Sequence, residues 1–227
     1  MEHNIKIEEQ KLYPTSIWKT KIPGYGLLNY ELEEYIYDLK KNNPKGLKAS
    51  NEKGWHSPAF NINDKVIVKF INKVDKVLDN ILTNLEWDLE NYFFGYKNIW
   101  SIINNKYSYN LQHHHGDSLL SLAYYVKIPK DNLGGHFYFV DPRVASRQRR
   151  PPMKKPESPL LLEKTNAKYN KMFNVEEGDI LIFPGWLEHG VKQSFSDEDR
   201  IVISANINLY LKEEKKQKGF HPDYFSD

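Results

Sequence analysis

The stretch Arg200–Tyr210, RIVISANINLY, alternates polar and apolar residues along its length. In a β-strand successive side chains point to opposite faces of the sheet. One face would therefore carry Arg200, Val202, Ser204, Asn206 and Asn208, and the other Ile201, Ile203, Ala205, Ile207 and Leu209. The apolar face suits packing on a helix. The mainly polar face suits the interior of a β-barrel that holds a small polar ligand.

Two helices are expected before this barrel. Asn29–Asn42 has apolar residues at helical spacing and stops at a proline. A longer helix is predicted from Asp64 to about Tyr92, where apolar residues recur every three or four positions, with a break near Thr83 as an alternative. Five later segments have the aromatic and β-branched composition of strands: Ile99–Ile103, Ser118–Val126, His136–Val140, Asp179–Phe183 and Arg200–Tyr210. Helices followed by strands indicate an α+β, mainly β fold, with an antiparallel sheet or barrel packed on helices.

Size and composition favour one domain over residues 1–227, with an N-terminal strand and helices in 1–92, a barrel in 93–212 and a tail in 213–227. The net charge of +2 gives no reason to expect nucleic acid or an anionic membrane as a partner. The absence of cysteine excludes disulfides, cysteine-ligated zinc and a thiolate nucleophile. No signal peptide or long apolar run is evident, so a cytoplasmic protein is expected.

The segment 143–172 has neither helical nor strand periodicity. It is rich in proline and basic residues, namely Arg147, Arg149, Arg150, Lys154 and Lys155. Loops of this length in a compact domain are commonly functional. Two interpretations stay open: a solvent-exposed loop without a specific role, or a lid or partner-docking segment.

Three consecutive histidines precede the strand at 118–126. On an extended chain His113 and His115 point to the same side, so the pair can present two imidazoles to one metal ion. His189 follows the segment EGDILIFPGWLEH and could return a third nitrogen to the same point. A metal site is therefore predicted, with iron or zinc as candidate metals. The alternative is that these histidines only form hydrogen bonds in a turn.

Asp117 offers a second possible ligand set. His115, Asp117 and His189 would form the two-histidine, one-carboxylate triad of non-haem Fe(II) oxygenases. The competing set is His113, His115 and His189. Strand geometry alone does not choose between the two.

Arg200 is the second part of the predicted site, beside the histidines. It lies eleven residues after His189, at the head of the alternating strand and on its polar face. The planar guanidinium suits the distal carboxylate of a dicarboxylate co-substrate bound to the metal, and Ser204 could add a hydroxyl. The alternative for Arg200 is an ion pair with Asp197 or Asp199.

These residues resemble a family of 2-oxoglutarate/Fe(II) oxygenases found in marine bacteria and their phages. HHHGDSLLSLAYYV (His113–Val126) is similar to the family pattern H-x-H-P-x-S-x-x-S-G-x-Y-Y. The resemblance also covers LYPTSIW (Leu12–Trp18), SNEKGWHSP (Ser50–Pro58), an aromatic strand around Trp100, FVDPR (Phe139–Arg143), EEGDILIFPGWLEHGV (Glu176–Val191) and RIVISANI (Arg200–Ile207), with order and spacing in agreement over five segments.

The resemblance implies a double-stranded β-helix (jelly-roll) with N-terminal helices packed on the major sheet. It implies Fe(II) at His113, His115 and His189, because the family pattern does not restrict the position of Asp117 to aspartate. It also implies O2 and 2-oxoglutarate as co-substrates, the latter held by Arg200. The implied reaction is hydroxylation of a peptidyl or small-molecule substrate, with release of succinate and CO2, in the host cytoplasm if the protein is phage-encoded.

The chain departs from the family pattern at Gly116, Leu122 and Val202, where the pattern has proline, glycine and serine. The loss of that serine leaves Ser204 as the hydroxyl on the strand. The aromatic residues nearest the expected ligands, and so candidates for the pocket lining, are Tyr124, Tyr125 and Trp186.

Two rival functions stay open. A cupin metalloenzyme would usually place a glutamate where Leu119 and Leu120 stand. The other rival is a metal-binding barrel without oxygenase activity that acts as a protein-interaction module. The oligomeric state, a homodimer included, is open as well.

Overall fold

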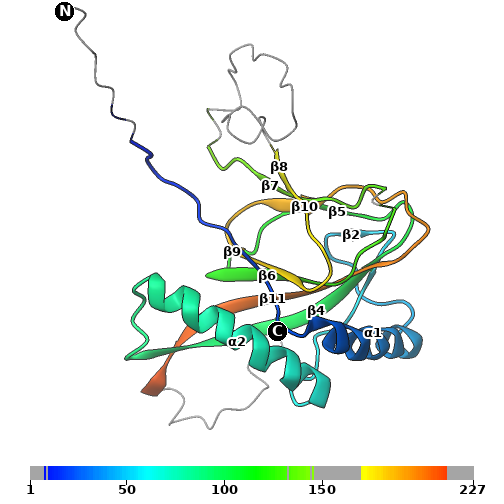
Figure 1. The fold of residues 1–227 in the computed structure, drawn as a ribbon, viewed down its shortest axis with the longest axis horizontal. Helices are drawn as coiled ribbons and strands as arrows, with labels where there is room; N and C mark the ends of the chain where they lie inside the picture. The colour runs from blue at the N-terminus through cyan, green and yellow to red at the C-terminus, as the bar shows by residue number, and fades with distance from the viewer. Residues whose placement is uncertain (1–7, 9, 132, 144, 146–169, 214–227) are drawn as a thin grey trace, which may run out of the picture.

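A computed structural model of the chain describes residues 8, 10–131, 133–143, 145 and 170–213 (Figure 1). The two helices are α1 (Tyr25–Asn42) and α2 (Lys65–Asn84). The strands are β1 (Trp18–Lys21), β2 (Asn51–Glu52), β3 (Trp55–His56), β4 (Tyr92–Asn104), β5 (Tyr109–His113), β6 (Leu120–Lys127), β7 (Phe137–Val140), β8 (Asn170–Phe173), β9 (Asp179–Pro184), β10 (His189–Val191) and β11 (Arg200–Leu211).

The strands form two antiparallel sheets that face each other (Figure 1). The six-stranded sheet has the order β1-β9-β6-β11-β4-β3, and the five-stranded sheet has the order β2-β5-β10-β7-β8. Both helices cover the outer face of the six-stranded sheet (Figure 1). This is the predicted jelly-roll barrel with N-terminal helices on its larger sheet.

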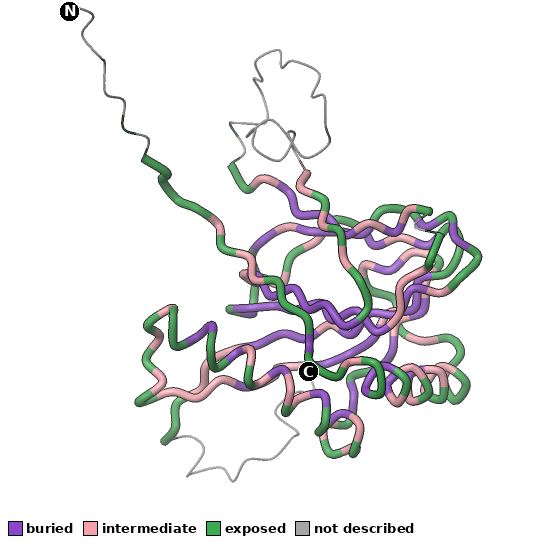
Figure 2. Tube along the Cα trace, in the orientation of Figure 1, coloured by how far each residue is buried: buried purple, intermediate pink, exposed green. Residues whose placement is uncertain are grey.

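The alternation of β11 is confirmed by the packing on its two faces. Ile201, Ile203, Ala205 and Ile207 are buried in one hydrophobic cluster with the inner face of α2. Val202 belongs to a second cluster between the sheets. Figure 2 shows the resulting continuous burial along the central strands. The helix-facing side of β11 thus anchors the strand, while the other side is free to line the barrel interior.

The predicted C-terminal end of the second helix, near Tyr92, is wrong. α2 stops at Asn84, and the chain turns through Glu86, whose φ of 55° is incompatible with a continuing right-handed helix. Asp88 then accepts hydrogen bonds from the backbone N–H groups of Glu90 and Asn91. Leu85 and Leu89 lie in this turn and pack against the core. Their apolar side chains continue the helical spacing of α2 in the sequence, so the turn was predicted as helix.

Strand lengths also differ from the predictions. β4 has 13 residues, and the predicted Ile99–Ile103 is only its more buried end. The short strands β2, β3, β5, β8 and β10 were not predicted, since two to five residues carry too little periodicity to be recognised. The predicted tail beyond Glu213 lies outside the described residues. So does most of the basic loop, including Arg147, Arg149, Arg150, Lys154 and Lys155.

Among the described residues, neither helix combines the length and the apolar character needed to cross a membrane.

The interface between α2 and the sheet should dominate stability. Phe70 of α2 is fully buried, and its ring centroid lies 5.2 Å from that of Tyr124 on β6. Phe70→Ala should therefore lower the free energy of unfolding by about 3–5 kcal/mol in urea denaturation. Val68→Ala on the exposed side of the same helix should change it by less than about 0.5 kcal/mol. Equal losses in the two variants would contradict this packing.

Candidate metal and co-substrate site

Strand pairing brings the three predicted histidines together. His113 is the last residue of β5 and lies opposite His189, the first residue of β10. Residues that are directly opposite in an antiparallel pair project to the same face. His115 follows in the loop after β5, where its backbone N–H donates a hydrogen bond of 2.8 Å to the carbonyl of Gly185. This bond holds the loop against the chain that leads into β10.

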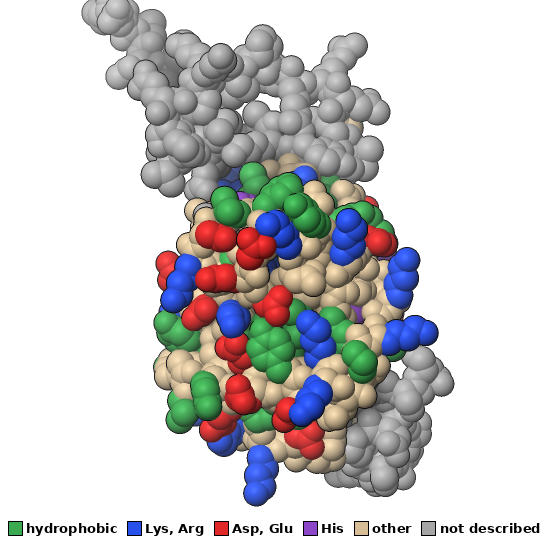
Figure 3. All heavy atoms as spheres, turned by 90° about the vertical axis from the view of Figure 1, so that its right-hand side faces the viewer, with side chains coloured by type: hydrophobic (Ala, Val, Ile, Leu, Met, Phe, Trp, Pro, Cys, Tyr) green, Lys and Arg blue, Asp and Glu red, His purple; other side chains and the backbone are tan. Residues whose placement is uncertain are grey.

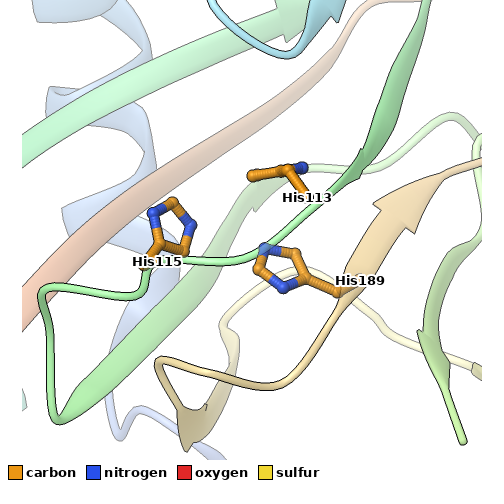
Figure 4. A group of neighbouring side chains, drawn as sticks. All are labelled: His113, His115 and His189. Atoms are coloured by element: carbon orange, nitrogen blue, oxygen red, sulfur yellow. The ribbon is translucent and has the colours of Figure 1, made fainter. Parts of the chain in front are cut away.

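The three imidazoles form a compact cluster (Figure 4). One ring nitrogen of each histidine lies within 4.8 Å of a nitrogen of each other. The ring centroid of His113 lies 4.4 Å from that of His189 and 5.1 Å from that of His115, and the remaining distance is 5.2 Å. Within the described part of the chain, this is the one group of potential ligands close enough to hold a metal ion.

Backbone carbonyls determine which nitrogens are available. The Nδ1 of His113 lies 2.7 Å from the carbonyl oxygen of Leu111, and the Nδ1 of His189 lies 2.8 Å from that of Leu187. Because a carbonyl only accepts, each Nδ1 must carry the proton. Each Nε2 therefore keeps its lone pair, as in metal-ligating histidines held by an outer hydrogen bond.

Burial keeps the three imidazoles neutral. It lowers the pKa of His189 to about 3 and that of His115 to about 4, with a smaller contribution from the neighbouring His113. Burial also lowers the pKa of His113. Since a histidine must be deprotonated to bind a metal, the folded chain presents the ligand form at neutral pH.

Asp117 lies apart from this cluster. Its side chain is 64% exposed and forms an ion pair with Lys97. The hydrogen bond from Lys97 lowers the pKa of the Asp117 carboxyl. The structure therefore groups His113, rather than Asp117, with His115 and His189. The chain from His115 through Gly116 to Asp117 forms a turn instead of continuing a strand, so the expected alternation of side chains is lost there.

Arg200 shares a cavity with the histidines. The cavity has a volume of about 260 Å³ and is lined by all three histidines and by Arg200, Val202 and Ser204 from the inner face of β11. The Arg200 side chain is buried, and its Nη2 has no hydrogen-bond partner among the described residues. The alternative of a structural ion pair is not observed: Asp197 contacts Lys106, and Asp199 accepts a hydrogen bond from Tyr37.

Tyr125 completes the surroundings of Arg200. The guanidinium carbon lies 5.1 Å from the centroid of the Tyr125 ring, which is fully buried. The Tyr125 hydroxyl interacts with the Arg200 guanidinium and donates to no acceptor within the described part of the chain. Burial raises the pKa of Tyr125 to about 12, so the hydroxyl keeps its proton. A buried cation and a buried donor without acceptors fit an anionic ligand group at this point.

The other aromatic candidates lie elsewhere. Tyr124 faces the helices, where its hydroxyl donates a hydrogen bond to Asn29, so it belongs to the core. Trp186 is half exposed and does not line the cavity. The sequence reasoning missed Trp100 and His56, both of which do line it. Trp100 lies opposite Ser204, and this position could have identified it as a lining residue. It depends on the register of β4 and β11, which the sequence alone does not give.

Known proteins support an assignment to a family. Residues 98–206, which span the barrel from β4 to β11, match the family described as "Putative 2OG-Fe(II) oxygenase". A search of curated proteins found no match.

Solved structures share the fold at low identity. A prolyl-4-hydroxylase from Pseudomonas putida has a TM-score of 0.60 and 10% identity, over 87% of this chain and 94% of that protein. HygX from Streptomyces hygroscopicus, solved with nickel, 2-oxoglutarate and hygromycin B, has a TM-score of 0.58 and 12% identity, over 86% and 83%. A prolyl hydroxylase from Trichoplax adhaerens, in complex with a peptide fragment of hypoxia inducible factor, has a TM-score of 0.56 and 10% identity, over 92% and 90%.

The matched segment contains β5 and β10, which carry His113 and His189, the loop with His115, and Arg200, which lines the same cavity. By this sequence match over residues 98–206, its double-stranded β-helix and its cluster of three histidines, the chain is similar to the 2-oxoglutarate/Fe(II) oxygenases.

Proposed function

We propose that His113, His115 and His189 bind Fe(II) at one end of the cavity. Their nitrogens lie within 4.8 Å of one another, and the two Nδ1–H groups of His113 and His189 are already engaged by carbonyls. Three protein ligands leave coordination positions for a co-substrate and O2. This site would contain three neutral ligands where the common oxygenase triad has two histidines and a carboxylate.

We further propose that Arg200 binds the distal carboxylate of 2-oxoglutarate. The observation that carries this assignment is a buried guanidinium without an anionic partner among the described residues, in the same cavity as the histidines. The Tyr125 hydroxyl would donate a second hydrogen bond to this carboxylate, and Ser204 is the hydroxyl nearest along the same face of β11. Fork-shaped guanidinium groups bind carboxylates with two parallel hydrogen bonds.

The iron and its co-substrates would supply the oxidation, in which 2-oxoglutarate would give succinate and CO2, with one atom of O2 ending in the new carboxylate of succinate and the other in a hydroxyl group of the substrate. The chain would contribute the positions of the ligands, the orientation of 2-oxoglutarate between Arg200 and the histidines, and a cavity whose wall includes the buried apolar rings of Phe137 and Phe183. We propose hydroxylation of a peptidyl or small-molecule substrate, since solved structures with this fold include one with hygromycin B bound and one in complex with a peptide fragment.

Purified protein with Fe(II), O2 and 2-oxoglutarate should form succinate, slowly in the absence of a substrate and faster with it. NMR of 13C-labelled 2-oxoglutarate measures the conversion directly. Replacing Fe(II) by Zn(II) should stop it, because zinc occupies histidine sites without redox chemistry. If no succinate forms with any candidate substrate and no iron is bound, the chain is a protein-interaction barrel instead.

A further inference from the structure

A hairpin at the barrel edge supplies part of the cavity wall. This closing hairpin, Asn51–His56, pairs through β2 with β5 in the smaller sheet and through β3 with β4 in the larger sheet. It therefore links the two sheets at one edge of the barrel. Ser50, which directly precedes it, and His56, its last residue, both line the cavity that contains the histidine cluster. The proposed roles of iron and 2-oxoglutarate use neither residue.

An aromatic wall adjoins His115. Trp100 lies directly opposite Ser204 in the register of β4 and β11, so both side chains project to the inner face of the larger sheet. The Trp100 ring is nearly parallel to that of His56, at an interplanar angle of 9° and a centroid distance of 5.8 Å. Its centroid also lies 5.8 Å from that of His115. A group bound against Trp100 would thus lie beside a proposed metal ligand.

This wall has unused hydrogen-bonding groups. The Nε1–H of Trp100 is buried and has no acceptor within the described part of the chain. The Nδ1 of His56 donates to the carbonyl of Ser57 at 2.7 Å, which leaves its Nε2 as an acceptor. The Oγ of Ser50 accepts a hydrogen bond of 3.3 Å from Asn110, which leaves its hydroxyl hydrogen to donate. Buried donors without partners are rare in folded proteins and indicate a missing ligand or water.

The charge of the lining restricts what can bind. None of the described lining residues is an aspartate or glutamate, so an ammonium or guanidinium group would find no counter-charge. Arg200 is the one lining arginine or lysine among them, and 2-oxoglutarate would occupy it. A second carboxylate would therefore be equally unpaired. Because an unpaired charge is costly to bury, the bound group must be polar and uncharged.

We propose that Ser50, His56 and Trp100 form a substrate subsite that receives an uncharged backbone amide of a residue within a peptide chain. The amide carbonyl would accept a hydrogen bond from Trp100 Nε1–H, and an amide N–H would donate to His56 Nε2. An internal residue of a peptide carries amides and no terminal charges, whereas a free amino acid carries an ammonium and a carboxylate. This inference rests on the proposed function, because it takes Arg200 as occupied by 2-oxoglutarate.

NMR of the 15N-labelled indole groups tests the subsite in the protein loaded with Zn(II) and 2-oxoglutarate. The chain has five tryptophans, and the Trp100 signal is the one that disappears in Trp100→Phe. The probes are N-acetylated, C-amidated tripeptides with a central proline, asparagine or leucine, compared with the free amino acids proline, asparagine and leucine, which carry terminal charges. A neutral tripeptide should move the Trp100 signal downfield and bind at least about ten-fold more tightly than the corresponding free amino acid.

Trp100→Phe keeps a ring against His56 and His115 but removes the donor, so it should weaken binding of the neutral tripeptide about ten-fold. Trp186→Phe, at a half-exposed position outside the cavity, should leave that binding unchanged. A Trp100 signal that no neutral tripeptide moves, free amino acids that bind equally well, or a signal already shifted by 2-oxoglutarate alone would overturn the inference while the proposed function stands. Failure of Zn(II) and 2-oxoglutarate to bind would overturn both.

Discussion

His189→Ala should abolish stoichiometric Fe(II) binding. The imidazole is buried, is held by the carbonyl of Leu187 and lies beside both other histidines. Loss of an outer-shell partner alone weakens metal binding by about 10- to 100-fold, so loss of a ligand should weaken it by more than about 100-fold. Anaerobic titration with Fe(II), followed by desalting and metal analysis, measures the effect. Retained stoichiometric iron would refute the ligand assignment.

Three variants complete this measurement. His113→Ala should lose iron as severely as His189→Ala, whereas Asp117→Ala should retain it, because Asp117 is exposed and paired with Lys97. The reverse order would establish the set of His115, Asp117 and His189. His136→Ala, a histidine outside the cluster, controls for the substitution itself and should bind iron like the parent protein.

Arg200→Met should raise the KM for 2-oxoglutarate by on the order of 100-fold, because truncating one partner of a buried charged pair costs about 2–5 kcal/mol. Methionine keeps much of the apolar stem over Tyr125 but removes the guanidinium. Succinate formation as a function of 2-oxoglutarate concentration gives the KM, and iron binding in the same variant shows that the histidine cluster is intact.

Arg143→Met is the matched control, since Arg143 pairs with Asp141 and does not line the cavity. It should leave the KM for 2-oxoglutarate unchanged. Arg200→Lys should be intermediate, because an ammonium keeps the charge and loses the two-pronged geometry. An unchanged KM in Arg200→Met would show that the distal carboxylate of 2-oxoglutarate binds elsewhere.

Local sequence patterns predicted the secondary structure of the longer segments and the face that each one buries. The alternation in Arg200–Tyr210 predicted which face of β11 meets the helices, because burial of one face of a strand requires a period of two. The same argument placed Arg200 and Ser204 on the face that lines the cavity. The turn after α2 was misread because its leucines are apolar for contacts with a distant core rather than for helix packing.

The sequence by itself therefore determined the presence of both helices, the longer strands, the polar inner face of β11 and the residues able to bind a metal. Only the tertiary structure decided which of them meet. The register of β5 with β10 brings His113 opposite His189, the loop with His115 is bonded to Gly185, and Asp117 lies exposed in an ion pair with Lys97. The register of β11 with β4 sets Trp100 beside Ser204. Such pairings join residues far apart along the chain, and a local period contains no information on them.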